Sequence, residues 1–504
     1  MIRKLWADRR GSYTITFGLA GLTLVLAAGG TTDMMRFLDT RAKLQDAVDR
    51  AALIVATQHK NSESGDGSSD TATARAVLTK TFDSRFGTLG TVTATTADNN
   101  LTVAADATIG TYFLKIGGVE TLAAAASATA TWSASSLEIA MVLDTTGSMA
   151  DNGKLTAMKS AASSMVDTLS AKASSTYSIK FSVVPFANFV NVGPSYGSAS
   201  WIDQGGSQRS SIYDAYFSEH ADRMAIFAKL GKTWPGCVET RPAPYDMDDT
   251  APSTSSPDTL FVPAIHPDEP DSGSYVANDY MDDQTYTWDS VSRMKNKKKY
   301  DNPVNVDLSN SNLYSNYRVP KGPQFLCDTK PLMRLSNSYS GVKSQISSLV
   351  AAGSTNVPEG VAWGIRTLSP KAPFSDGKSY SDTENSKIMV VLTDGTNSIN
   401  TFPTSLGGAY SSWGYPYSQR LGSNPGSNLR DGLDAKTRAV CAKAKAAGIK
   451  VYTIGLMIDD AAGQQLLSDC SSGAAYYYNS PSASQLQAIF DDIAKKISKL
   501  RISA

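Results

Sequence analysis

From Ser136 to the C-terminus, short apolar runs alternate with segments of helical periodicity, and this alternation restricts the fold more than any other feature of the sequence. The runs are apolar along almost their whole length, as expected for parallel strands covered by helices on both faces. We expect strands at 137–143, 178–184, 387–393, 449–456 and 474–478. We expect helices at 154–169, 339–352, 359–368, 431–447 and 483–500. The pattern predicts an α/β fold with a doubly wound, mainly parallel sheet.

Two long segments interrupt this alternation. The segment at about 188–338 is rich in Pro, Asp, Tyr and Ser, and the one at about 396–430 is rich in Gly, Ser, Tyr and Pro. Loops of this length inside a compact domain are usually functional insertions. We therefore expect a single α/β domain over 135–504 that carries both segments as insertions.

The N-terminal segment predicts a membrane anchor. Residues 11–32 carry no charge, and four basic residues precede them: Arg3, Lys4, Arg9 and Arg10. About 20 such residues cross the hydrocarbon core, and positive charge before them favours a cytoplasmic N-terminus. We expect a basic start and transmembrane anchor over 1–32, with the bulk of the chain extracytoplasmic. A cleaved signal peptide is the alternative, because Ala27-Ala28-Gly29 offers small residues for cleavage.

The segment between the anchor and Ser136 predicts a helix followed by a small domain. Apolar residues recur at helical spacing within 33–60: Leu44, Val48, Ala51, Ala52 and Val55. This amphipathic helix resembles the stalk of pilin-like proteins, and the alternative is a helix that packs on its own domain. In 61–134, two β-branched runs flank a polar turn at 97–100, which is a hairpin signal. We expect a small α+β membrane-proximal domain there.

Charge and histidine content limit the classes of function. Lys and Arg together number 47, as do Asp and Glu, so the chain has no net field that would attract nucleic acid. Three histidines are scattered without the spacing of a zinc site. A bound metal must therefore use oxygen ligands, which favours Mg²⁺, Mn²⁺ or Ca²⁺.

The four cysteines are compatible with two disulfides in an oxidising compartment. We prefer the pairs Cys237–Cys327 and Cys441–Cys470, because each pair lies within one region of the chain. The other two connectivities and four free thiols remain open at the level of the sequence.

One short turn concentrates oxygen-bearing side chains. Asp144, Thr146 and Ser148 follow the strand at 137–143 and precede a helix. They should therefore gather at the carboxyl end of the sheet, where open α/β sheets place their ligands. One carboxylate and two hydroxyls on the same turn suit a hard cation.

Two later positions belong to the same pattern. Asp394 follows the strand at 387–393, so it should lie at the same edge of the sheet as Asp144. Thr355 adds a hydroxyl in a loop just before a helix. Together these residues predict a site of two carboxylates and three hydroxyls.

These five residues resemble the metal-ion-dependent adhesion site of von Willebrand factor A domains. The family pattern is DxSxS, then a Thr, then an Asp, and this chain differs only in having Thr146 for the first Ser. The resemblance implies a divalent metal, with Mg²⁺ as first choice and Mn²⁺ or Ca²⁺ as alternatives. It also implies that one coordination position stays open for an acidic side chain of a protein partner.

The whole chain resembles TadG-like proteins of the tight-adherence (Flp-type) pilus-assembly system. The resemblance lies in the order of basic start, apolar helix, pilin-like helix, small β-containing domain and heavily inserted A domain. Further shared segments are 237–242, 268–270, 327–331 and 500–503. It implies a bacterial envelope protein of pilus assembly and adhesion, held in the cell membrane by one span, with other envelope proteins as partners.

Two other functions compete with metal-dependent partner binding. A strand-ending Asp followed two positions later by Thr is also found in Mg²⁺-dependent phosphotransferases that use an aspartyl nucleophile. That mechanism leaves Ser148 and Thr355 without a role, and the chain has no GxSxG, P-loop or Rossmann glycine pattern. We therefore predict that the protein is not an enzyme. The remaining alternative is a structural envelope protein in which the metal only stabilises the domain.

Overall fold

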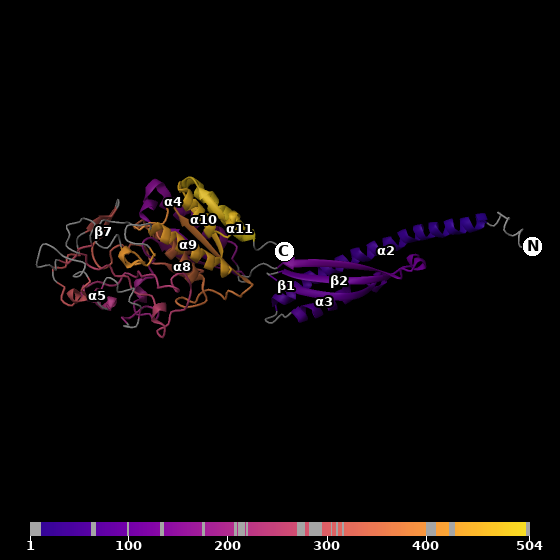
Figure 1. The fold of residues 1–504 in the computed structure, drawn as a ribbon, viewed down its shortest axis with the longest axis horizontal. Coiled ribbons are helices and arrows are strands. Elements are labelled where there is room, and N and C mark those ends of the chain that lie inside the picture. The colour runs from indigo at the N-terminus through magenta and orange to yellow at the C-terminus, as the bar shows by residue number, and fades with distance from the viewer. Residues whose placement is uncertain are drawn as a thin grey trace, which may run out of the picture. The chain divides into compact units, whose positions relative to one another are not determined.

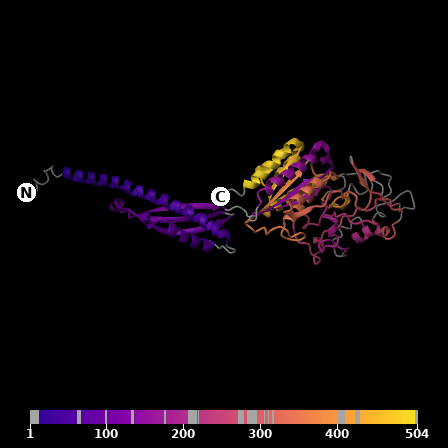
Figure 2. The ribbon, with the colours of Figure 1, turned by 180° about the vertical axis from the view of Figure 1, so that it is seen from behind.

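The chain divides into two compact units, one up to residue 133 and one from residue 134 to 498. Figures 1 and 2 show the ribbon from opposite sides. The computed structural model describes the following residues: 12–61, 67–97, 100–131, 136–173, 177–205, 209, 217, 220–269, 278–281, 295–303, 305–308, 311–314, 317–399, 410–422 and 429–499.

In the described residues of the first unit, two helices pack on a three-stranded antiparallel sheet. The helices are α2 (Ser12–Asn61) and α3 (Gly67–Thr81), and short 3₁₀ turns occur at η2 (Ser84–Phe86) and η3 (Leu114–Gly117). The strands lie in the order β1 (Thr88–Ala97), β2 (Asn100–Gly110) and β3 (Thr121–Thr131). In β2, alternate residues are buried, so one face of the strand supplies the core and the other is more accessible.

The C-terminal half of α2 shares its core with this sheet. The five residues of the predicted apolar stripe are all buried, and they belong to one cluster with side chains of α3, β1 and β2. The helix therefore packs on its own domain, which was the second interpretation of its sequence. The predicted boundary between the helix at 33–60 and the domain at 61–134 therefore lies within elements that share one core.

No helix in the described part of the chain is long and apolar enough to span a membrane. Residues 1–11, which include the four basic residues that set the predicted orientation, lie outside the described residues.

The second unit is built on a six-stranded mixed sheet. Its order is β11 (Tyr477–Ser480), β10 (Lys450–Leu456), β9 (Asn385–Thr393), β4 (Ser136–Asp144), β5 (Ser178–Phe186) and β8 (Met333–Ser336). Five strands run parallel, and the edge strand β8 pairs antiparallel with β5. The mainly parallel sheet predicted from the sequence is confirmed. The prediction was wrong in one detail: β8 belongs to this sheet, although it lies inside the segment taken as the first insertion.

Helices cover both faces of this sheet (Figure 1). Side chains of α4 (Lys154–Ser170), α7 (Tyr339–Ser348) and α11 (Leu486–Lys499) share one core with alternate residues of β4. The other residues of β4 face α8 (Val357–Leu368) and α9 (Leu429–Ala446). The short helix α10 (Ala461–Cys470) lies against α9 and was not predicted.

The two insertions extend the core on the α8 side. Their described residues include the short helix α5 (Arg223–Lys229) and a small hairpin of β6 (Ser311–Tyr314) and β7 (Tyr317–Pro320). Short 3₁₀ turns lie in or beside them: η5 (Pro194–Tyr196), η7 (Pro257–Thr259), η8 (Lys297–Tyr300) and η9 (Pro416–Ser418). Most of the described chain here is irregular, yet Trp234, Phe261 and Tyr410 of the insertions are buried in one cluster with Trp363 of α8. These aromatic side chains therefore serve as core.

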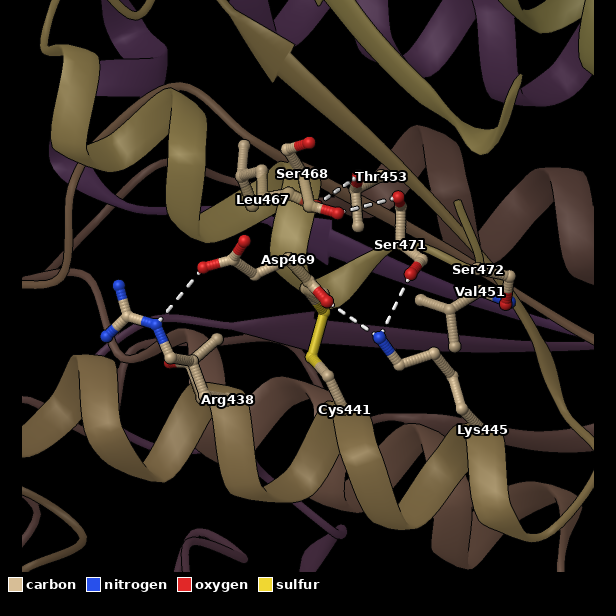
Figure 3. Close-up of a disulfide and its surroundings, with 12 residues drawn as sticks. Arg438, Cys441, Lys445, Val451, Thr453, Leu467, Ser468, Asp469, Ser471 and Ser472 are labelled. Carbon is tan, nitrogen blue, oxygen red and sulfur yellow. Dashed lines mark hydrogen bonds and ion pairs between the residues drawn. A yellow bond between two sulfur atoms is a disulfide. The ribbon is translucent and has the colours of Figure 1, made fainter. Parts of the chain in front are cut away.

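Both preferred disulfides are present. Cys237 pairs with Cys327 across 90 residues, and Cys441 pairs with Cys470 across 29 residues. Figure 3 shows the second bond joining α9 to the end of α10, with Lys445 beside it. Lys445 Nζ donates to the backbone carbonyls of Asp469 and Ser471, and so satisfies acceptors at the end of α10.

Candidate functional site

The carboxyl ends of β4 and β9 lie side by side because the two strands are parallel neighbours with Leu143 opposite Leu392. Asp144 ends β4, and Thr393 ends β9. The hydroxyl of Thr393 donates a hydrogen bond of 2.6 Å to Oδ2 of Asp144. The pairing of the strands therefore fixes one oxygen of this carboxylate.

The turn after β4 connects Asp144 to Asp394 through hydroxyl groups. The backbone N–H of Thr146 donates to Oδ1 of Asp144 at 2.7 Å. The hydroxyl oxygens of Thr146 and Ser148 lie 3.1 Å apart, and Ser148 donates to Oδ1 of Asp394 at 2.8 Å. Four of the five residues named from the sequence thus form a continuous chain of close contacts.

Thr355 reaches the same place from the loop before α8. A Cβ atom built on Gly395 would lie 3.5 Å from Oγ1 of Thr355 and 4.0 Å from Oγ of Ser148. The loop is tied to the segment after β9, since the N–H of Ser398 donates to the carbonyl of Thr355 at 2.8 Å. All five predicted site residues therefore lie near one another at the carboxyl ends of β4 and β9.

Both carboxylates of the site are buried. The exposed fraction is 0% for Asp144 and 6% for Asp394, whereas Ser148 is exposed. Burial, together with the nearby charge of Asp394, raises the pKa of Asp144 to about 7. The site thus combines two carboxylates that repel each other with an opening to solvent at Ser148.

Lys154, which was not predicted as a site residue, supplies a positive charge. Its ammonium lies 2.8 Å from Oδ2 of Asp394, and its side chain is only 11% exposed. Lys154 is the first residue of α4, and Asp394 lies 240 positions away, so no local sequence signal indicated the contact. Thr393 was also missed, although its place directly before Asp394 at the end of a strand is such a signal.

The donor set fits a hard divalent cation. In an octahedral Mg²⁺ site with bonds of about 2.1 Å, oxygens of neighbouring ligands lie about 3 Å apart. The contacts from Thr146 to Ser148 (3.1 Å) and from Ser148 to Asp394 (2.8 Å) have this spacing. Within the described residues, no group of three or more His, Cys, Asp or Glu side chains is placed to hold a metal. A cation here would therefore depend on hydroxyl oxygens as well as carboxylates.

Both insertions hold the Thr355 loop in place. Asn188, at the start of the first insertion, accepts the N–H of Ser354 through Oδ1 at 2.6 Å. Asn356 donates through Nδ2 to the carbonyl of Asn188 at 3.2 Å and to the hydroxyl of Ser412 at 2.9 Å. Trp413 donates to Oδ1 of Asn356 at 3.2 Å. The position of Thr355 therefore depends on contacts from both inserted segments.

The first unit resembles a known protein family. A family described as "Putative Flp pilus-assembly TadE/G-like" matches residues 11–58, a range that includes most of α2. Comparison with curated protein sequences gives no match.

Several solved structures resemble the chain at low identity. The pilus adhesin SpaC from Lactobacillus rhamnosus GG is 12% identical, covers 81% of this chain and has a TM-score of 0.32. This chain spans only 34% of the length of SpaC. The vWF domain of the type V pili tip protein Mfa5 from Porphyromonas gingivalis is 9% identical, with coverage of 73% of this chain and 96% of that domain and a TM-score of 0.32. The adhesive tip pilin GBS104 from Group B Streptococcus agalactiae is 11% identical, with coverage of 72% and 100% and a TM-score of 0.33. All three TM-scores lie below 0.5.

Proposed function

We propose that this chain is a membrane-anchored envelope protein of pilus assembly or adhesion, and that it binds a protein partner through a divalent metal. The metal, with Mg²⁺ as first choice, is held by Asp144, Thr146, Ser148, Thr355 and Asp394. The observation that carries the proposal is the convergence of two buried carboxylates and three hydroxyls at the ends of β4 and β9.

The electrostatics of the site support this assignment. Two buried carboxylates in proximity are costly unless a positive charge compensates them, and a divalent cation supplies that charge. A bound metal would also supply a Lewis-acidic position for an anionic ligand. Ser148 is the exposed member of the set, so the side of the site that faces solvent is where an acidic side chain of a partner would approach.

We further propose that the second unit is a von Willebrand factor A-type domain. Support comes from its mainly parallel sheet with helices on both faces and from the order of the five residues along the chain. The role in a pilus system is supported by the family match over 11–58, which includes residues 11–32 of the segment proposed as the anchor.

Calorimetric titration of the full chain in detergent with MgCl₂, MnCl₂ and CaCl₂ tests the metal site. We expect saturable binding by the parent, and affinities at least tenfold weaker for Asp144→Asn and Asp394→Asn. Asp151→Asn is the matched control, because Asp151 is an exposed carboxylate in the same turn (η4, Gly147–Gly153) and is not a site residue. A folded parent that binds none of the three ions, or a control that loses as much affinity as the other variants, would contradict the proposal.

Partner binding is tested separately from metal binding. We expect envelope proteins that co-purify with the full chain in Mg²⁺ to be lost in EDTA and in Asp144→Asn, while the metal-free melting temperature does not fall. If Asp144→Asn lowers the stability and leaves co-purification intact, the metal has a structural role instead.

A further inference from the structure

Exposed apolar side chains are concentrated at one place in the first unit. The large apolar residues exposed in the described part of the chain include seven from two short segments. These seven are Leu24, Met34, Met35 and Leu38 of α2, and Tyr112, Ile116 and Val119 between β2 and β3. We call these seven residues the apolar tip. Contiguous apolar surface is uncommon on soluble proteins and usually marks an interaction site.

The loop at 112–119 is fixed firmly to α2. The carboxylate of Asp33 accepts the backbone N–H groups of Tyr112, Phe113 and Leu114 at 2.8–2.9 Å. Burial alone would raise the pKa of Asp33, but these three donors hold the pKa below its usual value. Asp33 is 1% exposed, so its carboxylate interacts with groups of the protein instead of solvent.

Gly29 and Arg36 complete this attachment. A Cβ atom on Gly29 would lie 2.1 Å from the ring of Phe113, so the ring packs directly on the helix backbone. Arg36 donates to the carbonyl of Gly110 at 3.0 Å, and its guanidinium lies 4.1 Å from the ring centroid of Tyr112. The exposure of Tyr112, Ile116 and Val119 is therefore part of a well-defined structure.

The apolar tip surrounds α2 instead of covering one side of it. Successive residues of a helix are rotated by about 100°. On this basis Gly29, Asp33 and Arg36 share the side of α2 that holds the loop. Leu24, Met34, Met35 and Leu38 fall on the opposite side, where Met35 is 72% exposed. Exposed apolar side chains on both sides of α2 are compatible with immersion of this end of the unit in a lipid surface.

The charged groups of the tip also suit a lipid surface. Within 24–38 and 112–119, the only acidic residue is the buried Asp33, and the basic residues are Arg36 and Lys115. The exposed carboxylates Asp39 and Glu120 follow directly after these segments and would lie at the aqueous side of such a boundary. Tyr, Lys and Arg side chains have an apolar body and a polar end, which is why they are favoured at membrane interfaces. Towards its N-terminus, α2 continues directly into the charge-free segment.

We propose that the apolar tip lies in the boundary between headgroups and acyl chains on the outer side of a bilayer. The inference rests on the proposed membrane anchor and adds a second contact with the lipid, from a loop about 80 residues along the chain from Asp33. A single membrane helix can change its tilt in the bilayer. A second contact with the lipid would fix both the tilt of the first unit and its distance from the bilayer surface.

Spin labelling of the full chain in vesicles of phosphatidylcholine and phosphatidylglycerol tests this position. All four native cysteines are in disulfides, so Ile116→Cys provides a single labelling site. We expect the label to collide several-fold more often with oxygen, which partitions into lipid, than with a water-soluble nickel chelate. Thr95→Cys is the matched control, because Thr95 is exposed and pairs with Thr102, at the opposite end of the sheet from Gly110.

Each outcome is decisive. A label at residue 116 with the aqueous behaviour of the label at 95 would overturn the inference and leave the anchor intact. A label shielded from both reagents would show that protein covers the tip, which also overturns it. If the chain does not associate with the vesicles at all, the proposed anchor itself fails. Ile116 is exposed, so its replacement leaves the fold unchanged, which circular dichroism checks.

Discussion

The ammonium of Lys154 lies 2.8 Å from Oδ2 of Asp394, while Oδ1 of the same carboxylate accepts the hydroxyl of Ser148 at 2.8 Å. One carboxylate thus contacts both an internal cation and the hydroxyl chain of the candidate site. A metal bound by Asp394 would share its ligand with Lys154. The lysine is therefore expected to set the strength of metal binding.

Lys154→Met should strengthen Mg²⁺ binding by roughly tenfold, which corresponds to about 1.4 kcal/mol. The variant removes a like charge from the site and frees one oxygen of Asp394. The same change should lower the melting temperature of the metal-free protein, because the buried carboxylates then lack their compensating charge. Calorimetric titration and thermal unfolding measure the two effects. Lys159→Met is the control, since Lys159 lies on the same helix and donates to the carbonyl of Ser347. Equal Mg²⁺ affinity in parent and Lys154→Met would contradict the prediction.

Gly395→Ala should weaken Mg²⁺ binding at least tenfold and leave the metal-free protein stable. The new methyl group would lie at ordinary contact distance, 3.5 Å from the Thr355 hydroxyl and 4.0 Å from the Ser148 hydroxyl. It therefore fits the folded chain but takes up space between two of the expected ligands. Titration and thermal unfolding of the same preparation separate these effects. A variant with unchanged affinity would show that the ligands do not surround this position.

Replacement of both Cys441 and Cys470 by alanine should lower the free energy of unfolding by roughly 3–4 kcal/mol, as expected for a closed loop of this length. The bond closes 29 residues and joins α9 to the end of α10. Urea unfolding followed by circular dichroism measures the loss. The Cys237–Cys327 bond closes 90 residues, so its removal should cost somewhat more. An unchanged urea midpoint in either double variant would contradict the expectation.

Glu269→Gln should change how stability depends on pH. Burial raises the pKa of Glu269 to about 7, although it accepts hydrogen bonds of 2.7 Å from the N–H of Asn278 and the hydroxyl of Tyr415. The folded protein therefore binds more protons than the unfolded chain between pH 4.5 and 7, and this group lowers the stability as pH rises through that window. The glutamine of the variant does not titrate, so the variant does not lose this stability as the pH rises.

Urea midpoints at pH 4.5, 6 and 7.5 test this expectation. The variant should gain stability relative to the parent with rising pH, by an amount on the order of 3 kcal/mol over the whole window. Burial lowers the pKa of His266 to about 3, so its contribution runs the opposite way in both proteins. Its Nε2 lies 3.8 Å from Glu269, so the parent and the variant are also compared in a His266→Gln background, which removes this contribution. A constant difference across the three pH values would contradict the assignment.

The sequence predicted the regular core of the second unit because its strands are apolar and its helices amphipathic. Asp144 and Asp394 were found because each follows such a strand, and parallel neighbours place their ends together. The edge strand β8 has only four residues and no clear periodicity, so it was not separated from the insertion around it. The helix α10 was missed because it has only ten residues, and so few residues do not show a clear apolar period.

Contacts between distant segments account for the remaining differences. Lys154 meets Asp394 only because α4 begins beside the end of β9, and nothing near either residue indicates the pair. The burial of Trp234, Phe261 and Tyr410 against α8 is likewise set by the tertiary fold, because the segments that carry these residues show no regular apolar pattern.

The hydrogen bonds among Asn188, Asn356, Ser412 and Trp413 make the two inserted segments a support for the loop that carries Thr355. None of these four residues is among the five expected metal ligands, yet replacing any of them would remove a hydrogen bond that positions the Thr355 loop. If the proposed metal site is correct, variation in the insertions would adjust its affinity for the metal, and with it the strength of partner binding, while the five ligand residues are preserved. The most irregular segments of the chain would then be the ones through which its binding is tuned.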